Sequence, residues 1–177
     1  MPQYVKAVTA GGGDVLYALG QGLWTSRDAG RSWRRIGAPP SWTTGIAASR
    51  SKERVVYAAT GSGVMVSTDE GTTWRRAFAG HCRQPISALA TGADGAVYAF
   101  SLCQGLLRGD EPSGSWTVVA DDFDGCIIQH LAVDPSNDEV VFAVERCRTT
   151  VVSVDGGQRW SMYGSTSKWR WDCLSGP

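Results

Sequence analysis

The sequence predicts an all-β protein made of four repeated units, each with four short antiparallel strands. Three octets share the pattern Ser-x-Asp-x-Gly-x-x-Trp and begin at Ser26, Ser67 and Ser153. The 177 residues also include 22 Gly and 8 Trp, and few stretches have helical periodicity. Short apolar runs bounded by turn residues are typical of strands. We therefore expect strands and tight turns along the whole chain.

Each octet has the composition of a closed hairpin turn. The Asp carboxylate can accept hydrogen bonds from nearby backbone N–H groups, the Gly permits a positive φ, and the Trp anchors the returning strand. These roles predict structural positions at Ser26, Asp28, Gly30, Trp33, Ser67, Asp69, Gly71, Trp74, Ser153, Asp155, Gly157 and Trp160. The octets are therefore interpreted as folding devices and not as catalytic acids.

A degenerate fourth copy lies between the second and third octets. It keeps Asp110, Gly114 and Trp116 but lacks the Ser. With this copy included, the four Trp residues are spaced 41, 42 and 44 positions apart. A period of about 40 to 50 residues with several short strands per unit is typical of β-propellers.

The repeats divide one domain, residues 1–177, into four expected blades. Their approximate bounds are 3–39, 43–80, 84–122 and 127–164, and residues 165–177 form a tail or begin a further blade. Within these units, the first strand is expected at 4–9, the first strand of the third unit at 86–91, and a hairpin turn at 134–138.

The octets resemble the Asp-box, or BNR, repeat of sialidase-type propellers. The resemblance extends to the stretch from Leu131 to Asn137 and to Val140–Ala143, and it covers nearly the whole chain. Similar repeats occur in sialidases, xyloglucan-cleaving hydrolases, sortilin-type receptors and a photosystem II assembly factor. The resemblance implies the fold and leaves the function open. It also implies six or more blades, so we expect another chain or further blades to complete these four, with a compact four-bladed monomer as the alternative.

Charge and apolar content exclude several classes of partner. Seventeen basic and seventeen acidic residues give no net charge, which does not favour nucleic acid. No apolar run is long enough to span a membrane, and no signal-peptide pattern is visible at the N-terminus. His81 and His130 are too isolated to predict a metal site, and no cofactor is expected.

Four of the five cysteines occupy equivalent places in the third and fourth units. In an antiparallel blade the start of the first strand lies beside the end of the second, which predicts the disulfides Cys82–Cys103 and Cys126–Cys147. Each would stabilise the fold by roughly 3 kcal/mol. Buried free thiols are the alternative, and Cys173 is unpaired or interchain. Two disulfides would place the chain outside the cell, at the cell surface or in the periplasm.

The loops that vary between units lie at the end opposite the octets and carry the candidate binding residues. Exposed Trp beside Arg and Asp is typical of sugar-binding and protein-binding surfaces. The candidates are Trp42, His81, Arg83, Asp122, Asp124, Arg146, Arg148, Trp169 and Trp171.

The leading functional prediction is a non-catalytic binding or scaffold module for a protein partner or a glycan, as a homo-oligomer or a subunit of a larger assembly. The alternative is part of a sialidase-like or xyloglucanase-like glycoside hydrolase, completed by further blades or a second chain. Such an enzyme would have to pair Asp122 or Asp124 with Glu145. Nothing in the sequence indicates the Arg cluster and Tyr–Glu pair of a sialidase.

Overall fold

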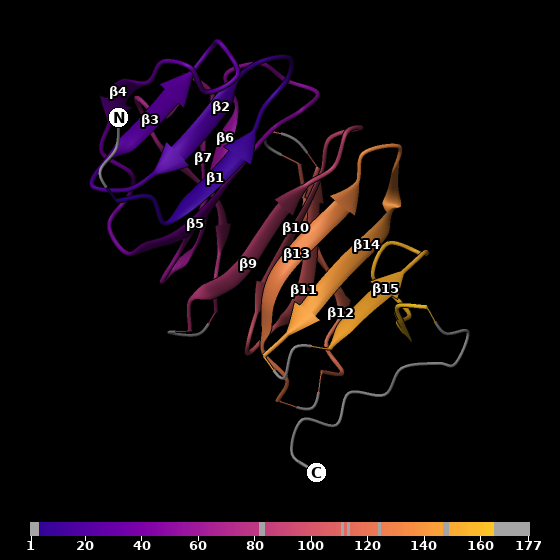
Figure 1. The fold of residues 1–177 in the computed structure, drawn as a ribbon. Helices are drawn as coiled ribbons and strands as arrows, with labels where there is room; N and C mark the ends of the chain where they lie inside the picture. Colours follow the sequence, from indigo (N-terminus) through magenta and orange to yellow (C-terminus); the bar gives the residue numbers. More distant parts are fainter. Residues whose placement is uncertain are drawn as a thin grey trace.

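The structure of this protein is a computed structural model that describes residues 4–81, 84–110, 112, 114–123, 125–146 and 149–164. Those residues form sixteen strands and no helix (Figure 1). No described segment forms a helix that could cross a lipid bilayer. The fold is therefore all-β, as predicted.

The strands form four antiparallel sheets, and each sheet contains four strands in sequence order. The first blade contains β1 (Ala7–Ala10), β2 (Leu16–Leu19), β3 (Leu23–Ser26) and β4 (Arg34–Gly37). The second contains β5 (Thr43–Ala48), β6 (Val56–Thr60), β7 (Gly63–Ser67) and β8 (Arg75–Ala79). The third contains β9 (Ile86–Thr91), β10 (Ala96–Ser101), β11 (Gly105–Asp110) and β12 (Trp116–Ala120). The fourth contains β13 (Ile128–Asp134), β14 (Asn137–Glu145), β15 (Thr150–Ser153) and β16 (Ser161–Met162).

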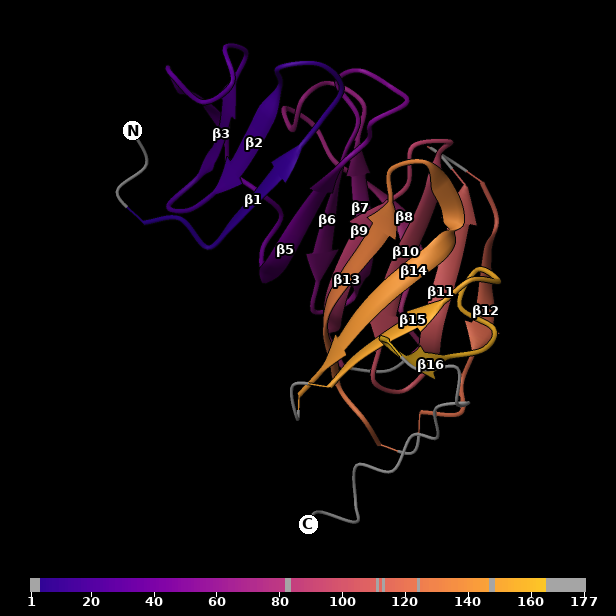
Figure 2. The same cartoon turned by 45° about the vertical axis from the view of Figure 1, so that its right-hand side comes forward.

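Three apolar clusters join successive blades. The first contains Tyr17 and Val56 and lies between blades one and two. The second contains Tyr57 and Val97 and lies between blades two and three. The third contains Tyr98 and connects blades three and four. Among the described residues no apolar cluster joins the first blade to the fourth, so the blades form an open series (Figures 1 and 2).

The first strands of the blades, β1, β5, β9 and β13, are the inner strands. Each contacts the inner strand of the next blade. Hydroxyl groups link them across the blade junctions: Thr44 Oγ1 donates to the Ile86 carbonyl at 2.9 Å, and Ser87 Oγ donates to the Ile128 carbonyl at 2.7 Å. Thr44 and Ser87 hold equivalent positions, so one hydrogen bond recurs at successive junctions.

The starts of β1 and β14 differ from expectation. β1 begins at Ala7, three residues later than the expected position 4. β14 begins at Asn137, because the preceding turn is only two residues long. Asp134 Oδ1 accepts from the Ser136 N–H at 2.7 Å, and Asn137 Oδ1 accepts from the Glu139 N–H at 3.0 Å. These local bonds close the hairpin tightly and leave Asn137 free to pair with Asp134.

Candidate functional site

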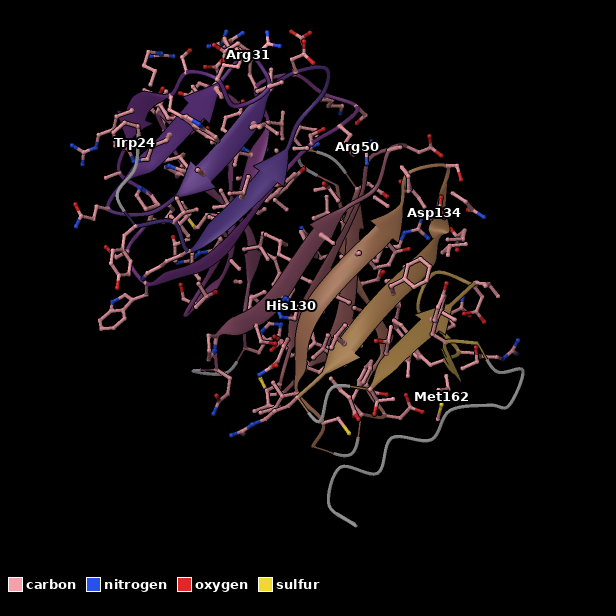
Figure 3. The ribbon with its side chains drawn as sticks, viewed as in Figure 1. Trp24, Arg31, Arg50, His130, Asp134 and Met162 are labelled. Carbon is pink, nitrogen blue, oxygen red and sulfur yellow. The ribbon has the colours of Figure 1, made fainter. Side chains whose placement is uncertain are left out.

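The blades have two chemically different ends, which follow from strand order. The octet turns and the turns between first and second strands lie at one end, called the octet end. The loops between blades and the turns between second and third strands lie at the other, called the loop end. Figure 3 labels Arg31, Arg50 and Asp134 along the octet end and Met162 towards the loop end.

At the octet end, the three octets have one hydrogen-bond pattern. The Ser hydroxyl donates to the Asp carboxylate at 2.7 to 2.9 Å in each octet and accepts from the Gly N–H at 2.7 or 2.8 Å. The Asp carboxylate also accepts from the backbone N–H four residues later, as Asp69 does from Thr73 at 2.8 Å. Each turn is therefore closed by its own side chains.

The octet backbone is left-handed at two consecutive residues. The residue before the Gly has φ values of 53° at Ala29, 64° at Glu70 and 70° at Gly156. The Gly itself has φ values of 88°, 89° and 92°, so the pattern requires Gly there. In all three octets the Trp Nε1 donates to the Gly carbonyl, at 3.0 or 3.1 Å.

The carboxylates of the first two octets, Asp28 and Asp69, are held in the ionised form. The Ser32 hydroxyl and N–H and the Ser26 hydroxyl lower the pKa of Asp28 to about 2. Thr73 and Ser67 lower the pKa of Asp69 in the same way, also to about 2. A general acid needs a raised pKa, so these groups are suited to closing turns and not to donating protons.

The interior of the open series is a groove along the inner strands. Towards the loop end its volume is about 220 Å³, and residues of all four inner strands or their leading residues line it. The polar side chains there are Lys6, Thr44, Ser87, Gln129 and His130. A second hollow of about 310 Å³ lies towards the octet end and is lined by the same strands. None of the described lining residues of either hollow is Asp or Glu.

The described candidate residues, Trp42, His81, Asp122 and Arg146, lie at the loop end. Trp42 immediately precedes β5, and its side chain is 86 % exposed. Its φ is +61°, an unfavourable conformation for an aromatic residue. A large apolar side chain held in solvent by a strained backbone is typical of a binding site.

The other described candidates also lie at the loop end. His81 is exposed at the loop end, where its N–H donates to Gln104 Oε1 at 3.1 Å and its ring lies edge-on to Phe78. Asp122 and Arg146 are exposed. None of these side chains lines the groove. Five candidates lie outside the described residues: Arg83, Asp124, Arg148, Trp169 and Trp171.

The carboxylates named for the hydrolase alternative differ in environment. Glu145 ends β14 and is only 4 % exposed. Asp122 is exposed in the loop before β13. The structure therefore describes one buried and one exposed carboxyl group at the loop end, and it does not test their pairing.

Sequence reasoning missed the groove residues Lys6, Gln129 and His130. The sequence suggests for His130 only the role of a metal ligand, but His130 lies exposed on β13 along the groove (Figure 3). Gln129 holds the position of Thr44 and Ser87 in the preceding blades. Comparison of the first positions of the inner strands could have revealed this set. Among the described residues, no group of three or more His, Cys, Asp or Glu gathers to hold a metal.

The cysteines are partly described. Cys103 and Cys126 are disulfide-bonded, and Cys126 is 1 % exposed within the core between blades three and four. Their predicted partners, Cys82 and Cys147, lie outside the described residues, as does Cys173. The pairing therefore stays a prediction.

A polar cluster fills the octet end between blades one and two. The Glu70 side chain is 9 % exposed and pairs with Arg27. Arg34 and Arg54 approach the same carboxylate at 3.7 and 3.6 Å. The Glu70 charge lies beside Tyr17, whose pKa burial raises to about 12. Arg27 and Arg34 belong to the first blade, so this cluster connects two blades.

No known protein-family model matches the chain, and no curated protein is similar to it in sequence. Solved structures share its fold. A chain of the nidogen/laminin complex superposes with a TM-score of 0.68 at 16 % identity, covering 86 % of this chain and 62 % of that one. An ancestral GH74 enzyme superposes with a TM-score of 0.63 at 15 % identity, covering 94 % and 25 %. The extracellular domain of a hybrid two-component system from B. thetaiotaomicron gives a TM-score of 0.63 at 18 % identity, covering 92 % of this chain and 22 % of that one.

This chain spans about a quarter of the GH74 enzyme. The sheets are therefore β-propeller blades, and at these identities the likeness shows the fold alone.

Proposed function

We propose that this chain is a non-catalytic binding or scaffold module that recognises a protein partner or a glycan at its loop end. The observation that carries the proposal is the loop-end part of the groove. Lys6, Gln129 and His130 offer ammonium, amide and imidazole groups there. Hydrogen-bonding side chains that converge in a concave site are typical of ligand recognition.

Trp42 supplies the apolar part of the proposed site. It immediately precedes β5, the strand whose Thr44 lines the loop-end part of the groove. Aromatic rings combine a large apolar surface with little conformational freedom, which makes them effective contacts for sugars and for proteins. We include Arg83, Arg148, Trp169 and Trp171 in the same proposal because the sequence predicts them in loops of this end.

Binding by wild-type protein to a glycan array and to candidate protein ligands tests this function. We expect Trp42→Ala and Gln129→Ala each to weaken binding by about tenfold or more. Val154→Ala is the matched control, because Val154 is an apolar residue 73 % exposed within the third octet. Equal binding by the Trp42, Gln129 and Val154 variants would contradict the proposed site.

The second candidate function is part of a glycoside hydrolase, favoured by one buried carboxyl group, that of Glu145, at the loop end. Fluorogenic glycosides test it directly. If wild-type protein cleaved a glycoside and both Glu145→Gln and Asp122→Asn abolished cleavage, the non-catalytic proposal would be wrong. We expect no cleavage above the rate without protein.

The octets support assignment to the Asp-box repeat, because one side-chain pattern closes all three turns. The paired cysteines support an extracellular, cell-surface or periplasmic location. Peptide mapping without reduction should recover Cys82 with Cys103 and Cys126 with Cys147. Recovery of alkylated thiols at these four positions would contradict both the pairing and the argument for the location.

A further inference from the structure

Every junction between blades uses the same positions. The aromatic residue in the middle of the second strand packs towards the next blade, and this residue is Tyr17, Tyr57 or Tyr98 in the first three blades. These three side chains are 3 %, 1 % and 0 % exposed. The next blade receives them with residues such as Ile46 and Val56 at the first junction.

The outward side of the fourth blade carries the same positions, and no blade follows it within the described part of the chain. Phe142 pairs with Ala132 as Tyr98 pairs with Ala90, so Phe142 is the equivalent of the three tyrosines. Phe142 is only half-buried, and Ala132 is exposed although Ala90 is buried. Val140, Val144 and Val152 alternate onto the same side of the sheet as Phe142. We call these residues the trailing face: Ala132, Val140, Phe142, Val144 and Val152.

The outward side of the first blade carries the complementary positions. Val8 pairs with Ala18 as Ile46 pairs with Ala58, yet Val8 is 57 % exposed and Ile46 is 7 % exposed. Leu16 holds the position of Val56, which is 0 % exposed, but is itself half-buried. Trp24 lies beside Ala18 on the same side. We call Val8, Leu16 and Trp24 the leading face.

Trp24 gives a second indication that the leading face lacks its cover. The Trp24 Nε1 atom is buried and has no hydrogen-bond partner among the residues that the structure describes. A buried indole N–H usually finds an acceptor, because its desolvation otherwise costs free energy. Met65 and Leu107 hold the equivalent position in the next two blades, and each packs into the core shared with the preceding blade.

We propose that the trailing face of one chain packs on the leading face of a second copy, and that two copies close one ring. Phe142 would meet Val8 and Leu16 of the second copy, as Tyr98 meets Leu131 and Val141 within one chain. One chain presents both faces, so a second copy would cover both of them at once. The zero net charge places no long-range repulsion between copies.

Such a ring contains eight blades, two sets of four, which is within the usual range for propellers. The two copies are related by a two-fold rotation about the central axis of the ring. Each copy contributes its fourth blade to one junction and its first blade to the other. The groove would then become a channel walled by the inner strands of both copies, so Lys6 and His130 of each copy would face a shared interior.

The solution mass of the 177-residue chain tests the proposal. Light scattering after size exclusion should give about 38 kDa, twice the 18.9 kDa of one chain. A mass of one chain would overturn the proposal and would leave these faces to a different partner or to further blades. A mass above two chains would also overturn it, because the two faces would then not close a ring of two copies.

Two substitutions test which surfaces meet. Phe142→Asp and Trp24→Lys should each weaken the dimer by about 30-fold or more, since each places a charge in an apolar junction. Val118→Asp is the matched control, because Val118 is 51 % exposed on β12 of the third blade, belongs to neither face and should leave the dimer intact. Near-ultraviolet circular dichroism checks that each variant keeps its folded core.

Mixing the two variants separates this arrangement from other dimers and from misfolding. A mixed pair has one wild-type junction and one junction with Asp opposite Lys, so mixing should restore the dimer. Failure to restore it would overturn the pairing of trailing with leading face. The proposal does not rest on the proposed function: loss of dimerisation leaves ligand binding by Trp42 testable on the monomer, and failed binding leaves the mass unchanged.

Discussion

The Leu23 side chain fills the space that a side chain at position 71 would occupy. Leu23 is in the first blade and is fully buried, whereas Gly71 is in the octet turn of the second blade. Leu106 and Gly157 repeat this relationship between the third and fourth blades. The octet Gly therefore does two things: it permits the left-handed turn and it accepts a leucine from the preceding blade.

Gly71→Ala should destabilise the fold through both effects. At a φ of +89° a residue with Cβ costs about 1 to 2 kcal/mol, and the clash with Leu23 adds roughly 1 to 3 kcal/mol. Urea unfolding measures the loss. Gly13→Ala is the matched control, because Gly13 has a φ of +62° and nothing within 4 Å of an added Cβ. Equal losses in the two variants would show that the contact with Leu23 is unimportant.

Ser67→Ala should destabilise the second octet turn by about 1 to 3 kcal/mol. Ser67 is 1 % exposed, and its hydroxyl accepts from the Gly71 N–H at 2.7 Å, so the substitution leaves a buried donor unpaired. Thermal unfolding followed by circular dichroism measures the change. Ser62→Ala, at an exposed hairpin position, should shift stability by no more than about 0.5 kcal/mol. If the two serines gave the same small shift, the hydroxyl would not be holding the turn.

Asp138→Ala should be among the most destabilising single substitutions at the junction of blades three and four. The Asp138 carboxylate is 5 % exposed and accepts from three backbone N–H groups of the third blade, at Ala93, Asp94 and Ala96. Loss of charge-assisted bonds to buried donors predicts a cost of about 3 kcal/mol or more. Asp138→Asn, which keeps one acceptor oxygen, should cost less. Urea unfolding that ranked Asn as costlier than Ala would contradict the hydrogen-bonding role.

The free energy of unfolding should decrease as the pH is lowered from about 4 to about 2. The folded-state pKa of Asp28 and of Asp69 is about 2, below the ordinary value of 3.8, because hydroxyl and N–H groups donate to each carboxylate. The unfolded chain therefore binds these protons first, and stability is lost as pH falls through this range. Melting temperatures across the range should drop less for Asp28→Asn/Asp69→Asn than for wild type. Parallel pH profiles would contradict this assignment.

Much of the fold could be predicted because each octet marks the turn between a third strand and the fourth strand that follows it. The predicted strand at 86–91 is the β9 of the structure, since clear turn residues bound it. The turn before β14 was predicted too long because two local side-chain bonds, from Asp134 and Asn137, close it within two residues. Composition indicates that such residues form turns, but it does not give the length.

The site was less predictable. Trp42 could be singled out because an apolar aromatic follows a Pro-rich turn, and the structure places it in solvent. Gln129 and His130 were missed, because their importance appears only when the starts of four inner strands, far apart in the sequence, are compared. Single polar residues at strand starts carry no sequence signal of their own. Only their equivalent places in successive blades bring them together.

Asp138 also bears on the order in which the chain can fold. Its carboxylate belongs to the fourth blade, but the turn that it closes, at 92–96, belongs to the third. In most repeat proteins a new unit adds to neighbours that are already complete. During synthesis, the third blade would leave the ribosome before Asp138, which lies more than forty positions later. Three of its backbone N–H groups would then still lack their acceptor. The last two blades should therefore fold as one cooperative unit, with the first two available as the template.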